Sequence, residues 1–300
     1  MWIALAFMSA FFLGLYDISK KTSVNGNAVI PVLFLNTFFC TLLLLPLFLL
    51  SRFSPGIFNL NSIFYMPSVD AATHLYILLK SAIVLSSWIF GYFAIKHLPL
   101  TITGPINAMR PVMTLVGALL IFGERLNLYQ WIGVILTIVS FALLSGSGKK
   151  EGIRFTHNKW IFFMVLAALL GAVSGLYDKF LMQRFNSTAV QFWYNFYQCI
   201  LMGIILLVLW YPKRAKNTPF VWRWNILLVS LFLTIADFVY FYALTDSDAM
   251  ISVVSMVRRS SVLVSFVGGI LFFREKNLKA KIIDLLLIIV AMIFLYLGTK

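Results

Sequence analysis

Apolar runs of roughly 17 to 25 residues, the length a helix needs to cross about 30 Å of hydrocarbon, recur from one end of this sequence to the other. With 61% hydrophobic and only 11% charged residues, a chain of 300 residues cannot hide this much apolar surface in its own interior. The sequence therefore predicts an all-α membrane protein that crosses the bilayer several times.

The apolar runs between charged residues predict ten transmembrane helices. They cover residues 2–19, 28–50, 73–95, 98–122, 127–145, 159–180, 188–211, 225–245, 248–273 and 281–298. No basic segment precedes the first run and no cleavage pattern follows it, so we expect a spanning helix there and not a signal peptide. The Lys and Arg residues behind the net charge of +14 lie mostly between the runs, as orientation signals do, so nucleic-acid binding is not expected.

The segment Gly-Leu-Tyr-Asp occurs twice, at residues 14–17 and 175–178. Other matches between the two halves follow in the same order: Ala10/Gly14 with Gly171/Gly175, Asn36/Cys40 with Asn195/Cys199, 91–95 with 240–244, and 122–125 with 273–276. This order indicates a duplication, with a first repeat at 1–146, a basic linker loop at 147–158 and a second repeat at 159–300. Five helices per repeat is an odd number, so the repeats are predicted to be inverted, as in secondary transporters.

The basic residues are unevenly divided between the predicted loops. The odd-numbered loops carry most of them: Lys20, Lys21, Lys96, Lys149, Lys150, Arg154, Lys159, Lys213, Arg214, Lys216, Arg223, Arg274, Lys276, Lys279 and Lys281. The even-numbered loops have little beyond Arg52, Arg125 and Arg184. Taken alone, the positive-inside rule places both termini outside the cell.

Three arginines lie deep inside predicted spanning helices. Arg110 is 12 residues from either end of its run, about 18 Å along the helix axis, and Arg258 and Arg259 take a similar place in the ninth run. An arginine at the centre of a lipid-exposed helix costs about 2.5 to 3.5 kcal/mol, so these side chains should face protein or a wet cavity. We expect Arg110 and one of the adjacent pair to bind substrate, with structural ion pairing as the alternative.

Two further charged residues lie within the predicted membrane depth. Asp237, midway along the eighth run, is the expected partner of one arginine and cannot neutralise all three. Lys80, in the third run, adds to the excess of positive charge unless its helix begins late and leaves it at the interface.

Backbone disruption points to the same fourth run. Gly104-Pro105 and Pro111 interrupt the hydrogen-bond ladder on both sides of Asn107 and Arg110, which is typical of transporter sites, although the prolines could simply kink a packing helix. Aromatic residues that could line a cavity, or simply pack, are Trp88, Tyr92, Trp193, Tyr194, Tyr240 and Tyr242.

The repeated aspartates, Asp17 and Asp178, each follow a small-residue helix face and a tyrosine, Tyr16 or Tyr177. One interpretation is structural pairing with nearby Lys20, Lys21 or Lys179. The other makes these aspartates and tyrosines, together with Lys80, coupling or gating residues at the two mouths of a pathway.

Enzymatic motifs are missing from the sequence. The three histidines, His74, His97 and His157, are scattered, and the sequence contains no H-E-x-x-H, P-loop or G-x-S-x-G pattern. The two cysteines, Cys40 and Cys199, lie inside spanning runs and support neither a disulfide nor a thiol metal site. We therefore expect no enzyme activity, no cofactor, no metal and no ATP-driven pump.

The motifs "GYFAI" (91–95), "YFYAL" (240–244) and "RPVMTLVGALLIFGERLNLYQWIG" (110–133) resemble those of the drug/metabolite transporters with two EamA-type repeats, over essentially the full chain. Pro111 and Glu124 are the most specific part, while Val262 and Arg274 depart from the pattern in the second half. The resemblance implies a monomeric ten-helix carrier, often an exporter of amino acids or other small metabolites, with a cavity lined by helices 1, 3, 4, 6, 8 and 9. It also implies cytoplasmic termini, against the charge count.

Together these features predict a secondary active transporter in a bacterial plasma membrane, which exports a small anionic or zwitterionic metabolite by alternating access. Arg110 with Arg258 or Arg259 would bind the anion, Asp237 would balance charge or accept an amine, and protons could be the coupling ion. A multidrug exporter of lipophilic compounds and a membrane-embedded enzyme acting on lipid-linked substrates are the alternatives.

Overall fold

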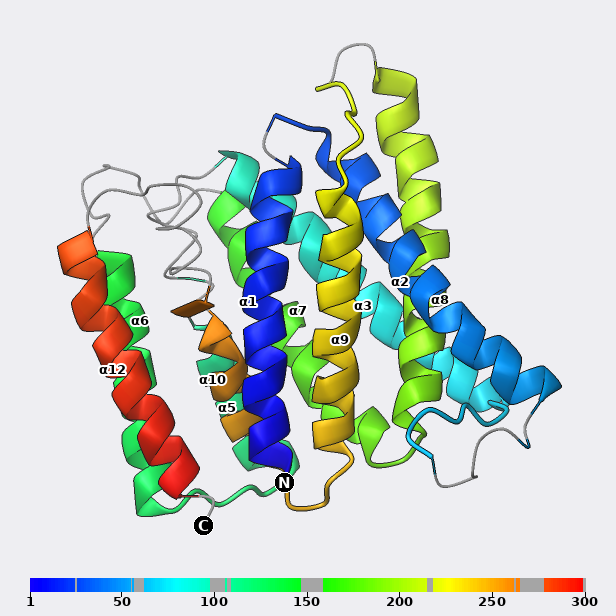
Figure 1. Ribbon diagram of the computed structural model, residues 1–300. Helices are drawn as coiled ribbons and strands as arrows, with labels where there is room; N and C mark the ends of the chain where they lie inside the picture. Colours follow the sequence, from blue (N-terminus) through cyan, green and yellow to red (C-terminus); the bar gives the residue numbers. More distant parts are fainter. Residues whose placement is uncertain are drawn as a thin grey trace.

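The computed structural model describes residues 1–24, 26–54, 56, 62–97, 106, 109–146, 159–214, 218–261, 263–264 and 278–298. Within these residues, all regular structure is helical and includes ten α-helices. Figure 1 shows these helices side by side in one bundle, with most of their axes crossing at moderate angles.

The helices agree with the ten apolar runs of the sequence. They are α1 Trp2–Val24, α2 Val29–Phe53, α3 Ala71–His97, α5 Arg110–Ile121, α6 Leu128–Gly146, α7 Lys159–Met182, α8 Ser187–Ile205, α9 Asn225–Leu244, α10 Ile251–Arg259 and α12 Leu278–Leu297. A π-helical turn, η3 Leu206–Trp210, and a 3-10 turn, η4 Tyr211–Lys213, continue α8. In the described part of the chain, six helices are long and apolar enough to cross a membrane, which fits a multi-pass membrane protein.

For two of the predicted helices, the structure describes shorter ranges than the sequence predicts. Of the predicted helix 98–122, the structure describes α5, which begins only at Arg110, and of the predicted helix 248–273 it describes α10, which ends at Arg259. Most of the remainder of both predictions lies outside the described residues. Arg110 is the first residue of α5, and Arg258 and Arg259 form the last turn of α10. At the last turn of a helix the dipole favours positive charge, so this position suits Arg258 and Arg259.

Contacts between the helices connect eight of them in a closed cycle. The contacting pairs, in order, are α1–α9, α9–α2, α2–α8, α8–α3, α3–α7, α7–α5, α5–α10 and α10–α1. The remaining two, α6 and α12, pack on each other at one side of this cycle (Figure 1). This order brings α3, α7, α9, α10 and α5, which carry most of the membrane-embedded charges, into one neighbourhood.

The two ends of the bundle differ in charge. Both termini lie at one end (Figure 1), where the described connections hold Arg125 and Arg184 together with the acidic Asp70, Glu124, Asp246 and Asp248. At the other end lie Lys20, Lys159, Lys213, Arg214 and Arg223, and we call this end the basic face. The division follows the uneven distribution of basic residues between odd and even loops in the sequence.

Candidate functional site

A buried ion pair joins the third and seventh helices. Lys80 of α3 donates from Nζ to Oδ1 of Asp178 in α7, and the two side chains are only 2% and 8% exposed. The Lys80 ammonium also lies 4.4 Å from the ring centre of Tyr194 and 5.1 Å from that of Phe241. Because α3 begins at Ala71 and its first half is enclosed by α7 and α8, Lys80 lies in the interior and not at the interface.

Tyr240 of α9 connects this pair to a second one. Its hydroxyl donates to Oδ2 of Asp178 at 3.2 Å, and the guanidinium of Arg258 lies 3.9 Å from the centre of its ring. Arg258 in turn donates from Nη2 to Oδ1 of Asp237 at 2.8 Å. We call Lys80, Asp178, Tyr240, Arg258 and Asp237 the Tyr240 network; it links four helices through two ion pairs and one aromatic side chain.

Arg110 lies beside this network without a carboxylate partner in the described part of the chain. Its Nη2 donates to the backbone carbonyl of Gly171 in α7 at 2.9 Å. A Cβ atom at position 171 would come within 2.3 Å of the Arg110 Cζ, so the glycine leaves the space that the guanidinium fills. Arg110 is nevertheless close enough to Arg258, Asp178 and Tyr240 to interact with them electrostatically.

Arg259 is the second arginine of this region that has no carboxylate partner among the described residues. Among the described residues no hydrogen bond or ion pair of Arg259 is seen, although it is close enough to repel Arg110 and to attract Asp17. Asp17 is exposed, whereas Asp178, its counterpart in the sequence, is buried in the Tyr240 network. With Lys80, Arg110, Arg258 and Arg259 against Asp17, Asp178 and Asp237, the seven fully ionised groups sum to 4 − 3 = +1.

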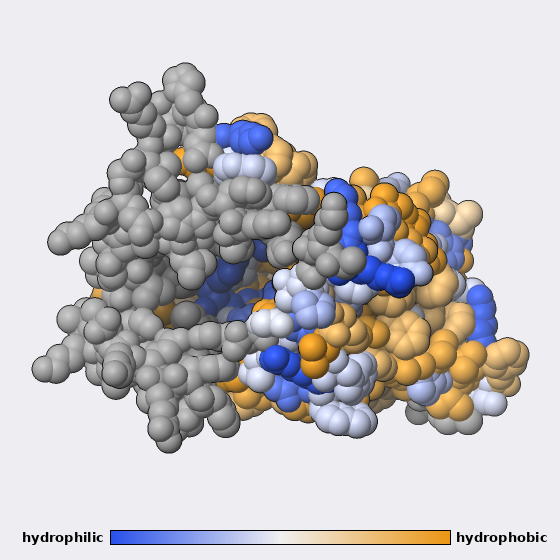
Figure 2. All heavy atoms as spheres, turned by 90° about the horizontal axis from the view of Figure 1, so that it is seen from above, coloured by the Kyte–Doolittle hydropathy of each residue, from blue (hydrophilic) through white to orange (hydrophobic). Residues whose placement is uncertain are grey.

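These seven groups, which we call the central charge cluster, lie on α1, α3, α5, α7, α9 and α10, six helices of the contact cycle. Figure 2, which looks onto the basic face, shows hydrophilic residues gathered in a recess inside the molecule. The cluster contains two guanidinium groups whose other donors have no partner in the described residues, and both lie beside a network of paired charges. Such an arrangement binds an anion and holds it in place; it contains no nucleophile activated by a base.

The sequence profile of the EamA-like transporter family matches residues 1–146 and again residues 158–297. The chain belongs to the EamA-like transporter family. It is a multi-pass membrane transporter with a small-molecule substrate, and not an enzyme.

Similar proteins agree with this assignment. An "Uncharacterized transporter" of Archaeoglobus fulgidus is 25% identical over 281 residues, which is 93% of this chain and 92% of the relative. A "Putative sugar uptake protein" of Lactobacillus johnsonii is 26% identical over 221 residues, covering 68% of this chain and 73% of the relative. A solved crystal structure of a protein superposes with a TM-score of 0.71 at 15% identity, over 99% of this chain and 96% of the other, so the fold is shared.

The other predicted site residues that the structure describes are not members of the central charge cluster. Tyr16 is buried in α1 with the Lys20 ammonium 5.3 Å from its ring centre, and the Tyr177 hydroxyl donates to the backbone carbonyl of Tyr76 at 3.2 Å. Trp88 lines a cavity whose lining contains no member of the central charge cluster. The predictions for Asn107 and for the side chain of Tyr92 fall outside the described residues.

The expected pairing of Asp178 with Lys179 is wrong. Neighbours on a helix point about 100° apart, so while Asp178 faces Lys80, Lys179 turns to Glu124 and donates to its Oε1 at 2.8 Å. The partnership of Asp237 with one arginine is confirmed by its bond to Arg258. Among the described residues, no group of three or more His, Cys, Asp and Glu side chains is arranged to hold a metal ion.

Glu124 has a larger structural role than the sequence indicates. Its Oε1 accepts the backbone N–H of Ile251 at 2.8 Å, and its Oε2 accepts the N–H and the hydroxyl of Ser252. The carboxylate therefore caps the N-terminus of α10, where the helix dipole favours negative charge. Gly123, with φ 61°, ends α5 and turns the chain so that Glu124 follows directly. The Gly-Glu pair after an apolar run was the only signal of this cap in the sequence.

Proposed function

We propose that this transporter is a secondary active exporter of a small anionic or zwitterionic metabolite, such as an amino acid, which it moves by alternating access. The observation that carries the proposal is the pair Arg110 and Arg259, which lie near each other, lack carboxylate partners within the described residues, and repel. Both arginines are half-buried. Holding two guanidinium groups partly out of water without a counter-charge is costly, and a bound anion would lower this cost.

The roles of the other charged groups follow from their partners. Arg110 and Arg259 would bind the carboxylate of the substrate, because a guanidinium presents a planar set of donors that fits a carboxylate. Asp17, exposed and within electrostatic range of Arg259, is available for an amine or for a proton. Arg258 is held by Asp237 and by the Tyr240 ring and would shape the wall of the site. Asn107 and Tyr92 stay predictions for the same site.

Two inverted repeats, 1–146 and 159–300 with the linker 147–158, are part of this proposal. The cycle of helix contacts is unchanged when α1 is exchanged with α7, α2 with α8, α3 with α9 and α5 with α10. In Figure 1, α1 begins at the end of the bundle that carries the termini, whereas α7 begins at the basic face. Both observations support a twofold relation between halves of opposite orientation.

Alternating access would then act on the bonds that join the two halves. Lys80 with Asp178 and Arg110 with Gly171 each connect a residue of the first half to one of the second. A movement of one half against the other would break and remake these bonds. A proton on Asp178 would weaken its bond to Lys80, and a proton on Asp17 would weaken its attraction to Arg259. Protons are therefore the coupling ion that we propose, with the transporter acting as a monomer in a bacterial plasma membrane.

Transport by the purified protein in proteoliposomes tests this proposal. We expect counterflow of radiolabelled amino acids or organic acids, and a loss of about tenfold or more in Arg259→Gln, since one hydrogen bond to a charged group contributes about 1.5 to 3 kcal/mol. Arg214→Gln, a change of an exposed arginine at the basic face, is the matched control and should leave transport unchanged. Efflux from preloaded cells measures the direction, and an imposed pH gradient measures the coupling.

The same assay separates the rival substrates. Transport of a neutral sugar, the kind of molecule suggested by the name of the Lactobacillus johnsonii relative, should be insensitive to the charge at position 259. Accumulation of lipophilic cations that is unaffected by Arg259→Gln would favour a multidrug exporter. Either result, without any flux of carboxylates, would refute the assignment of the anion site.

A further inference from the structure

The helices α3 and α8 are joined at one end and separated at the other. In the first half of α3, the Ser81 hydroxyl donates to the backbone carbonyl of Tyr194 at 3.3 Å, and His74 is hydrogen-bonded to Tyr197 at 3.0 Å. Further along, toward the basic face, a cavity of about 410 Å³ lies between the two helices and the start of α2. This volume falls within the range of small-molecule binding cavities.

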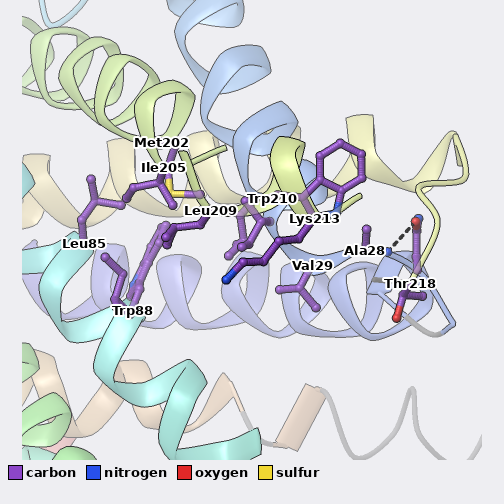
Figure 3. A pocket seen from close by; sticks show the side chains of 14 residues that line it. Ala28, Val29, Leu85, Trp88, Met202, Ile205, Leu209, Trp210, Lys213 and Thr218 are labelled. Carbon is purple, nitrogen blue, oxygen red and sulfur yellow. Dashed lines mark hydrogen bonds between the residues drawn. The ribbon is translucent and has the colours of Figure 1, made fainter. Parts of the chain in front are cut away.

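The wall of this cavity is mostly apolar. Leu85 and Trp88 of α3 face Met202 and Ile205 of α8 across it, and Leu209 continues the same wall (Figure 3). None of the charged residues of the central charge cluster lines it. The cavity is therefore suited to hydrocarbon and is distinct from the site proposed for the substrate.

One end of the cavity carries two polar groups for which the described residues provide no partner. The Lys213 side chain extends along the cavity in the direction of Trp88 (Figure 3), and within the described residues no carboxylate pairs with it. The indole Nε1 of Trp210 is buried and has no hydrogen-bond partner in the described part of the chain. Both residues lie in the π-helical and 3-10 turns that continue α8, and π-helical turns often mark functional sites. The Lys213 ammonium and the Trp210 indole N–H are therefore two donors, at the mouth of an apolar cavity, that could bind a ligand with acceptor oxygens.

The surroundings of the mouth select a negatively charged ligand. Arg214 and Arg223 lie in the same connection of the basic face, and neither segment 24–30 nor segment 205–225 contains Asp or Glu. Anionic lipid headgroups are attracted to such basic clusters, and tryptophans prefer the depth at which headgroups lie. A ligand that combines a phosphate with long apolar chains matches both ends of the cavity.

We propose that this cavity binds one anionic phospholipid from the leaflet at the basic face. Its phosphate would accept hydrogen bonds from the Lys213 ammonium and the Trp210 indole N–H. One acyl chain would lie along Leu85, Met202 and Leu209, in the opening between α3 and α8. The lipid would hold these two helices apart at the basic face, and its binding does not depend on which metabolite is transported.

Native mass spectrometry of the detergent-purified transporter, titrated with phosphatidylglycerol or phosphatidylcholine, tests the proposal. We expect one phosphatidylglycerol to stay bound with a clear preference over phosphatidylcholine. Lys213→Gln should weaken phosphatidylglycerol binding by about fivefold, the factor that corresponds to the attraction contributed by one lysine near an anionic membrane surface. Phosphatidylcholine has the same phosphate but no net charge, so Lys213→Gln should weaken its binding less than that of phosphatidylglycerol.

Two further variants make the test specific. Leu209→Trp should fill the apolar end and reduce the binding of both lipids. Arg214→Gln removes a neighbouring charge that does not line the cavity, so it should weaken phosphatidylglycerol binding less than Lys213→Gln does. Thermal unfolding of each variant shows whether it is folded. The proposal is overturned if Lys213→Gln binds phosphatidylglycerol like the unaltered protein, or if Arg214→Gln loses as much binding as Lys213→Gln.

Discussion

The guanidinium of Arg110 lies against the backbone of Gly171, so that a Cβ atom at position 171 would come within 2.3 Å of the Arg110 Cζ. The contact joins the start of α5 to the middle of α7 and leaves the other guanidinium donors free of described protein partners. Because of this contact, Gly171→Ala should displace Arg110 from the proposed substrate site without changing any charge.

Gly171→Ala should impair transport more than folding. Displacing Arg110 removes a hydrogen bond to a charged group, about 1.5 to 3 kcal/mol, while alanine recovers about 1 kcal/mol of helix propensity. We expect a small fall in the thermal unfolding temperature and a loss of substrate affinity of about tenfold. Gly175→Ala is the control, because its Cβ would be 4.0 Å from Thr114, an ordinary contact. Equal effects of the two alanines on transport would contradict the role of Arg110.

The Lys80–Asp178 pair should show strong coupling in stability measurements. Removing one partner leaves an uncompensated buried charge and should cost about 3 to 5 kcal/mol, so Lys80→Met and Asp178→Asn are each expected to lower stability sharply. The double variant should recover much of the loss, since no unpaired charge is left. A double variant whose loss equals the sum of the single losses would mean that the two side chains do not interact.

The contributions of the Tyr240 hydroxyl and of its ring to stability and transport should be measurable separately. Tyr240→Phe removes the hydrogen bond to Asp178 and keeps the ring beneath Arg258, so we expect a loss of about 1 to 3 kcal/mol of stability and slower transport. Tyr240→Leu also removes the cation–π contact with Arg258 and should lower both stability and transport rate further than Tyr240→Phe. In Tyr242→Phe, a control on the same helix, the lost hydroxyl has no described hydrogen bond, and both stability and flux should be close to those of the unaltered protein.

Glu124 should be needed to hold α10 in place. Glu124→Gln keeps a single acceptor oxygen, so it loses the acceptor for one of the amides of Ile251 and Ser252 together with the charge beside Lys179 and the helix dipole; Glu124→Ala loses every bond. We therefore expect destabilisation of at least about 2 kcal/mol for the glutamine and more for the alanine. Asp248→Asn changes an exposed acidic residue near the same helix and should have little effect. Chemical unfolding in detergent measures all three.

Asp70, just before α3, should add a small pH dependence to stability. The hydrogen bond from the Thr73 hydroxyl lowers the pKa of the Asp70 carboxyl below its ordinary value. A lowered pKa in the folded state means that the stabilisation is present above the unfolded pKa, about 3.9, and is lost as the pH falls through the folded pKa. The difference in unfolding temperature between the unaltered protein and Asp70→Asn should thus be constant near neutral pH and shrink below about pH 4. A difference that grows toward acid would contradict this cause.

Helix number and position could be predicted from the sequence because the membrane imposes a length requirement on each segment separately. The presence of buried charge could be predicted as well, since Arg110 and Asp237 interrupt apolar runs. The start of α5 at Arg110 and the end of α10 at Arg259 were only hinted at, by Gly104-Pro105 and Pro111 in the first case and by nothing local in the second.

Partners of the charges could not be predicted in the same way. Lys179 follows Asp178 in the sequence, yet the two side chains leave the helix in different directions and meet Glu124 and Lys80. If Gly91 is aligned with Tyr240, an offset of 240 − 91 = 149, then Lys80 corresponds to 80 + 149 = 229, which is Val229. The duplicated aspartates therefore differ: Asp178 has a lysine partner, and for Asp17 the corresponding position holds a valine.

The sequence by itself determined that this chain crosses a membrane many times, that its two halves share motifs, and that its apolar segments contain more arginine than acid. Each of these properties belongs to a single segment or to the amino-acid composition of the chain, so it does not depend on how the helices pack. Only the tertiary structure decided which charges are paired, that Tyr240 joins two ion pairs, and that Gly171 makes room for Arg110. Those relations depend on which faces of distant helices meet, and that is decided by the packing of the whole bundle.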